Sequence, residues 1–268
     1  MAEHYYYSIA SGSSGNCGLY MADGTAILID LGVSLRRITT ALKALSLTLE
    51  DISAVVLTHE HIDHVKGLPM FLKKAKAPVF ATRGTAEAFE EKNPEYADRL
   101  NIFDSGERFW VRDVDVVPFP TPHDAAESTG YIFEHGAAGS ALRPTLALCR
   151  AMRPSFCAAV KWSCWRATMT RTCCRPVRTR IRSRCALPDR AGTCPIRTAP
   201  YCSGSGESGT RTLVLAHLSE KNNMPELARQ QTLSALRGLP ACEVLVAPKE
   251  HMEHPVSFGE EKLCSLSG

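Results

Sequence analysis

The chain has 268 residues, of which 44% are hydrophobic, and a formal net charge of +3. This length and composition can supply one sizeable core, so we expect a single domain over residues 1–268. The sequence has no apolar run of membrane-spanning length, and Met1 to Ala10 lacks the charged-then-apolar order of a secretory signal. We therefore expect a soluble, cytoplasmic protein and exclude a membrane protein.

The predicted elements up to about residue 135 are strands and helices in alternation. Short β-branched or aromatic runs predict strands, and apolar residues at helical spacing predict helices. The strands are expected at Tyr5–Ala10, Ala26–Leu31, Ala54–Thr58, Val114–Phe119 and Gly130–Phe133. The helices are expected at Leu35–Leu45, Gly67–Ala75 and Thr85–Lys92. Further strands at Thr212–Ala216 and Val244–Ala247 flank a helix at Pro225–Leu236, so sheet layers with helices on their outer faces are expected.

The segment from about Gly136 to Ser205 fits none of these patterns. Eight of the eleven cysteines lie between Cys149 and Cys202, and Asp189 is the single acid among twelve arginines and one lysine from Arg143 to Arg197. The overall charge therefore describes no real surface and is not read as a nucleic-acid footprint. One reading is a basic disordered insertion, although disordered segments are usually poor in Cys and Trp.

We favour a frameshift over residues 136–205, because the codons that these residues allow restrict the neighbouring frame. In that frame Met169–Thr170 encodes Asp, Cys173–Cys174 encodes Leu, and Arg143–Ala147 permits Thr-Asp-Thr-Gly. We therefore expect this segment to be out of frame and not to fold natively.

The densest cluster of potential metal ligands follows the predicted strand Ala54–Thr58. His59, His61, Asp63 and His64 fall within six residues. In extended backbone His59 and His61 point the same way, while Asp63 and His64 would turn toward a second metal ion, about 3.5 to 4 Å away in two-metal hydrolases. Burying four such groups unpaired would be too unfavourable, so a metal site is predicted rather than a surface histidine cluster.

The string THEHIDHVKG, from Thr58 to Gly67, resembles the signature of the metallo-β-lactamase superfamily. The resemblance implies an α/β fold, a four-layer αββα sandwich with metals at one edge of the paired sheets, which the segment 136–205 would disrupt. Three further strings narrow it to the YycJ/WalJ-like branch: ASGSSGNC at 10–17, PHDA at 122–125 and HLSEKNN at 217–223. That branch is similar to phosphodiesterases such as tRNase Z and is associated with DNA exonuclease activity.

The resemblance implies two divalent metal ions, with zinc expected and manganese or iron as alternatives. It assigns three side chains to each ion: His59, His61 and His123 to the first, and Asp63, His64 and His217 to the second. Taken alone, His123 could be an ordinary loop histidine and His217 a core histidine. Asp63 would also act catalytically by orienting the metal-bound water. The family's bridging aspartate is absent, and the codon argument puts its place near Pro144 and Thr145.

The implied function is a metal-dependent hydrolase, a phosphodiesterase or exonuclease acting on DNA through a water activated by two metal ions. No membrane partner is expected, and the sequence predicts no oligomeric state. A glyoxalase-II-like thioesterase, which shares the HxHxDH spacing, is one alternative. An inactive product of a damaged gene is the other, because without the bridge we expect weak binding of one ion and little turnover.

Overall fold

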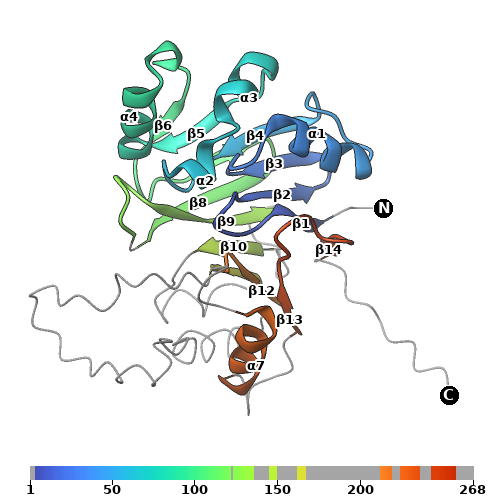
Figure 1. Ribbon diagram of the computed structural model, residues 1–268. Helices are drawn as coiled ribbons and strands as arrows, with labels where there is room; N and C mark the ends of the chain where they lie inside the picture. The colour runs from blue at the N-terminus through green and yellow to red at the C-terminus, as the bar shows by residue number, and fades with distance from the viewer. Residues whose placement is uncertain are drawn as a thin grey trace, which may run out of the picture.

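The computed structural model describes residues 4–121, 123–135, 145–149, 162–166, 212–218, 224–235 and 243–257. In these ranges the strands form two sheets (Figure 1). The first has the order β14 (Val256–Ser257), β1 (Tyr5–Ala10), β2 (Cys17–Ala22), β3 (Thr25–Ile29), β4 (Ile52–Val56), β5 (Val79–Thr82), β6 (Asn101–Phe103). The second has the order β13 (Glu243–Val246), β12 (Thr212–Ala216), β11 (Trp162–Arg166), β10 (Thr145–Cys149), β9 (Thr129–His135), β8 (Val114–Pro120), β7 (Phe109–Val111).

The sheets share one core, in which aromatic side chains from both layers meet. Tyr20 of β2 stacks on Phe133 of β9 with ring centroids 4.8 Å apart, and both side chains are fully buried. Strands β1, β2 and β3 are buried along their whole length. They read as nearly continuous apolar runs because both faces of their sheet are covered.

Helices cover the outer faces and complete the four-layer αββα sandwich. Figure 1 shows α1 (Leu35–Ala44), α3 (Leu68–Lys74) and α4 (Arg83–Lys92) on the first sheet, and α7 (Pro225–Ala235) beside β12 and β13. A one-turn helix, α2 (Ile62–Val65), and a 3₁₀ turn (Pro94–Tyr96) complete the described helical elements. Ile38 and Leu42 of α1 and Phe71 of α3 face the core and are fully buried.

The predicted helices are confirmed with ends shifted by one or two residues, except that Leu236, the last residue of the fourth, lies outside the described residues. Strands β2, β5, β6, β7 and β14 were not predicted. Within 136–205 no element was expected, yet the structure has β10 and β11; the rest of that segment lies outside the described residues. No helix among the described residues is long and apolar enough to cross a membrane.

Candidate metal centre

The candidate centre lies where the parallel strands β3 and β4 end side by side in the first sheet. Asp30 directly follows β3 in a left-handed conformation, with φ of 58°, and its amide donates to the carbonyl of Val56 at 3.0 Å. Leu57 and Thr58 continue beyond β4 and lead to His59. Polar side chains after two apolar strands are thus gathered at one sheet edge, the usual place for ligand sites in open α/β sheets.

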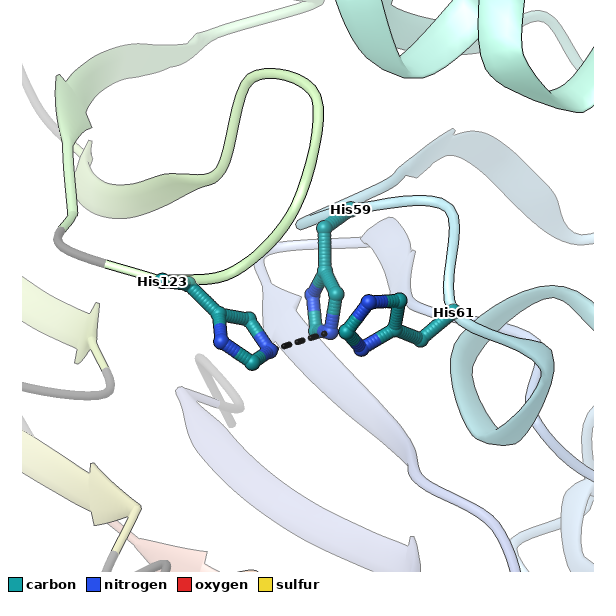
Figure 2. Close-up of side chains that lie close together, drawn as sticks. All are labelled: His59, His61 and His123. Atoms are coloured by element: carbon teal, nitrogen blue, oxygen red, sulfur yellow. Dashed lines mark hydrogen bonds between the residues drawn. The ribbon is translucent and has the colours of Figure 1, made fainter. Parts of the chain in front are cut away.

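His59, His61 and His123 form the first group, the histidine trio shown in Figure 2. His59 and His61 come from the loop after β4, and His123 comes from the connection between β8 and β9 in the other sheet. The Nε2 atoms of His59 and His123 are 3.1 Å apart, and each residue of the trio offers a ligand atom within 4.8 Å of the others. Three imidazoles converging on one point suit a transition-metal ion.

Hydrogen bonds set which nitrogen of His59 and His61 is available. The Thr58 hydroxyl donates to Asp30, so it accepts from His59 Nδ1 at 2.9 Å, which leaves the lone pair on Nε2. His61 Nε2 donates to the carbonyl oxygen of Asp124 at 3.1 Å, which leaves Nδ1 for a metal. Metal-ligating histidines generally donate their second ring nitrogen to such a partner.

The loop that carries His123 is fastened to the loop that carries the other two histidines. Besides the bond from His61 to Asp124, a Glu60 carboxylate oxygen accepts from the amide of Ala126 at 2.9 Å. The carboxylate of Asp124 lies 2.5 Å from His123 Nδ1, which orients that ring as well. The trio is therefore held in place by contacts between the two sheets.

Asp63, His64 and His217 form the second group. One carboxylate oxygen of Asp63, Oδ2, lies 2.9 Å from His217 Nε2 and 3.2 Å from His64 Nε2. Desolvation of Asp63 opposes ionisation, but hydrogen bonds and positive charge from His217 and His64 outweigh it and hold the pKa of this carboxyl well below its usual range. The group thus offers a carboxylate and two imidazoles to a cation.

Three buried side chains position the second group from behind. Asp30 accepts from His64 Nδ1 at 2.7 Å and from Thr58, so Nε2, which faces Asp63, is the His64 nitrogen available to a metal ion. The side-chain amide of Asn16 donates to the carboxylate of Asp63 at 3.0 Å. The Ser11 hydroxyl accepts from the backbone amide of His217 at 2.6 Å. His217 has a φ of 57°, so this contact stabilises a conformation that side chains seldom adopt.

The structure brings all six expected ligands together in two groups. The groups are adjacent, since the ring centroids of His59 and His64 are 4.0 Å apart. Thr145 is not among them. It begins β10 opposite Glu134, near the end of β9 that is remote from the centre, and Pro144 lies outside the described residues. Among the described residues, none belongs to both groups.

Sequence reasoning missed the positioning residues Asp30, Asn16, Ser11 and Thr58. The sequence does contain a signal for Asp30. It is a charged residue near the end of the apolar strand predicted at Ala26–Leu31, and His59 likewise comes at the end of the strand predicted at Ala54–Thr58. In the sequence, the Ser-Gly string at 11–15 and Asn16 carry only a family resemblance. The structure gives them contacts with His217 and Asp63.

Comparison with known proteins agrees with the fold. Residues 10–143 match the family described as the metallo-beta-lactamase superfamily. The exodeoxyribonuclease YycJ of Bacillus anthracis is 30% identical over 239 residues, 87% of this chain and 89% of that protein. A hydroxyacylglutathione hydrolase of Xylella fastidiosa is 36% identical over 94 residues, 35% of this chain and 34% of that protein.

Among solved structures, the metallo-beta-lactamase fold protein YhfI of Bacillus subtilis has a TM-score of 0.67 at 13% identity, covering 96% of this chain and 100% of that one. This likeness concerns the fold, which is known to bind divalent metals through His and Asp side chains of the kind gathered here. The chain is therefore a hydrolase that belongs to the metallo-β-lactamase superfamily.

Proposed function

We propose that this protein is a metal-dependent phosphodiesterase of exonuclease type that acts on DNA. The observation that carries the proposal is the pair of three-ligand groups placed side by side at one edge of the sandwich, with His59 and His64 in ring contact. An arrangement of five imidazoles and one carboxylate suits two divalent ions, and zinc fits it best, with manganese or iron as alternatives.

The residues would divide the work as follows. His59, His61 and His123 would hold one ion, and Asp63, His64 and His217 the other. When bound, two such ions supply a water of lowered pKa that can attack phosphorus. Asp63, whose carboxylate contacts both His64 and His217, would hold its ion and orient that water. Asp30 and Thr58 would act as positioning residues, because they touch the ligands and not the reacting atoms.

DNA is favoured over a glutathione thioester by the extent of the two similarities. The likeness to the B. anthracis exodeoxyribonuclease extends over 87% of this chain, and that to the hydroxyacylglutathione hydrolase over 35%. The shorter match is what a shared metal motif alone would produce. The longer one also takes in residues well outside the motif.

We also propose that residues 136–205 are out of frame within a single domain spanning 1–268. A family-type bridging carboxylate is then absent from this chain, and the two ions would lose the group that sets their separation. A displacement of about 1 Å at a catalytic centre can lower the rate on the order of 100-fold. We therefore expect weak binding of one ion and little turnover from the chain as written, and recovery after correction of the frame.

The test compares the chain as written with a frame-corrected chain. Each is assayed with end-labelled linear DNA, a nitrophenyl phosphodiester and a glutathione thioester, in the presence of Zn²⁺ or Mn²⁺. We expect DNA and phosphodiester hydrolysis from the corrected chain and at least about 100-fold less from the other. Thioester hydrolysis alone would overturn the proposed substrate, and equal rates from both chains would overturn the frameshift.

Variants of the corrected chain test the ligands. His59→Ala and His61→Ala should lower bound metal and hydrolysis together, because each removes one imidazole of the trio. His254→Ala is the matched control, since that exposed histidine belongs to neither group. Full metal content in both trio variants would show that the site has been misassigned.

A further inference from the structure

A third group of potential ligands, His4, Asp23 and His135, lies at the end of the sandwich opposite the metal centre. His4 immediately precedes β1, Asp23 lies in the turn between β2 and β3, and His135 is the last residue of β9. Their ligand atoms all lie within 4.8 Å of one another. We call these three residues the distal cluster.

The distance between the two sites follows from the course of the strands. β9 begins at Thr129, whose amide donates to the carbonyl of Thr58 beside the metal centre, and ends at His135 in the distal cluster. Six steps of about 3.3 Å along a strand separate the two ends by roughly 20 Å. The distal cluster therefore cannot share an ion with the metal centre.

Short separations between different donor types define the distal cluster. His4 Nε2 lies 3.0 Å from Asp23 Oδ2, and His135 Nδ1 lies 3.6 Å from the same carboxylate oxygen. The rings of His4 and His135 meet edge to face with centroids 4.9 Å apart. Bonds of 2.0 to 2.2 Å around a tetrahedral ion place neighbouring ligand atoms roughly 3.3 Å apart, and the two measured separations lie on either side of that value.

Asp113 determines how the His135 ring is presented. Its Oδ2 atom accepts from His135 Nε2 at 2.7 Å, and its Oδ1 atom accepts from the Thr25 hydroxyl at 2.7 Å. With the proton of the neutral ring on Nε2, the lone pair is on Nδ1, toward Asp23. A carboxylate behind the distant nitrogen of a histidine is the arrangement that orients metal-ligating histidines in proteins.

Burial adds a further argument. The side chains of His4 and His135 are 11% and 10% exposed, while that of Asp23 is 38% exposed. The two imidazoles are thus fixed within the protein, and the carboxylate side of the cluster is open to solvent. Such a site can take an ion from solution and complete its coordination with water.

We propose that His4, Asp23 and His135 bind a single divalent transition-metal ion at this end of the sandwich, with Asp113 as a positioning residue. Two imidazoles and one carboxylate select Zn²⁺, Co²⁺ or Ni²⁺ over Mg²⁺ and Ca²⁺, which prefer oxygen ligands. The ion joins the start of β1 and the β2–β3 turn, in the first sheet, to β9 in the second. Its role is structural, because binding to the folded state alone stabilises that state.

The test measures metal binding and does not depend on hydrolysis. The full chain is freed of metal with a chelator and dialysed against Zn²⁺ or Co²⁺, and bound metal is counted by mass spectrometry. His4→Gln and His135→Gln should each lose about one ion per chain, or bind it at least ~10-fold more weakly. Asp113→Asn should weaken that ion about 10- to 100-fold. His254→Gln, an exposed histidine outside the three groups, should leave binding unchanged.

Two further measurements separate the possible outcomes. In His59→Ala, where the histidine trio is impaired, the ion of the distal cluster should still bind and should raise the unfolding temperature. A failure of the proposed hydrolase would leave this result intact. Unchanged stoichiometry and affinity in His4→Gln and His135→Gln would overturn the proposal and leave the cluster an ion-pair network. His4 precedes the first strand, so its variant should fold even if His135→Gln does not.

Discussion

Replacing Asp30 with Asn tests whether the side chains behind the second group set its affinity for metal. Asp30 is 1% exposed and accepts from the Thr58 amide at 2.8 Å, from the Thr58 hydroxyl and from His64 Nδ1 at 2.7 Å. An Asn oxygen can still accept from Thr58. The NH₂ group of that Asn then faces His64 Nδ1. Either the His64 ring moves its proton from Nδ1 to Nε2, or a buried N–H donor is left without an acceptor.

The magnitude follows from these two options. Moving the proton to His64 Nε2 removes a ligand lone pair, and changes behind a metal ligand typically lower metal affinity 10- to 100-fold. That range corresponds to about 1.4 to 2.8 kcal/mol of binding free energy. If the buried donor is left unpaired instead, the free energy of unfolding falls by about 1 to 3 kcal/mol. One of the two quantities must therefore change.

The assay is a competition titration of the frame-corrected chain against a chromophoric chelator, together with denaturant unfolding of the metal-free protein. Asp51→Asn is the matched control. Asp51 also accepts from a threonine amide and hydroxyl, those of Thr48 at 2.7 and 2.8 Å, but on the surface and away from the metal centre. If Asp30→Asn behaves like Asp51→Asn in both measurements, the positioning role of Asp30 is wrong.

Three further predictions concern packing, pH and the middle segment. Gly32→Ala should lower the free energy of unfolding by about 3 kcal/mol, because the new methyl group would meet the backbone of Asp63 and lie 2.6 Å from the Asn16 nitrogen. Gly106→Ala, which meets no atom within 4 Å, should lose only about 1 to 2 kcal/mol in the same denaturant titration, the cost of a side chain at its left-handed φ of 89°. The Asp63 carboxyl, with its lowered pKa, should stay ionised in metal-free protein as pH falls from 5 to 3. Its contribution to the free energy of unfolding is complete above about pH 3.9 and is lost only below that pH. A titration midpoint near 3.9, measured by NMR, would contradict the contacts described for this carboxyl. Residues 136–205 should form no stable core, because their apolar residues lack a sustained period. Strong hydrogen-exchange protection throughout this segment would refute the frameshift.

Local signals were sufficient for the core of the metal centre. His59, His61, Asp63 and His64 sit on one loop after an apolar strand, so their proximity follows from the sequence itself. His123 came only through resemblance, because nothing local distinguishes it from an ordinary loop histidine. His217 also had a local signal, since it directly follows the apolar run Leu213–Ala216, but that place fits a core histidine as well. The structure places them by pairing β8 with β9 and β12 with β11, contacts between residues far apart along the chain.

Elements were predicted where hydrophobic periodicity was long enough. β6 and β7 have three residues each, and β5 has four after a proline, which is too short for a period of two to be recognised. The hydrogen bond from His64 to Asp30 and the meeting of His4 with His135 depend on how strands lie beside one another. No spacing within the chain encodes these contacts, so sequence reasoning could not find them.

The distribution of the ligands along the chain has a consequence for synthesis. The histidine trio is complete once residue 123 has been made, whereas the second group is complete only after His217 has been made. At roughly 5 to 20 residues per second, the ribosome needs on the order of 10 s for the stretch between them. During that interval a nascent chain can present only one complete group of the metal centre, so the two ions of that centre would be acquired in a fixed order. Chains stalled before and after residue 217 would reveal this order as a step in bound metal, and equal metal content in both would argue against it.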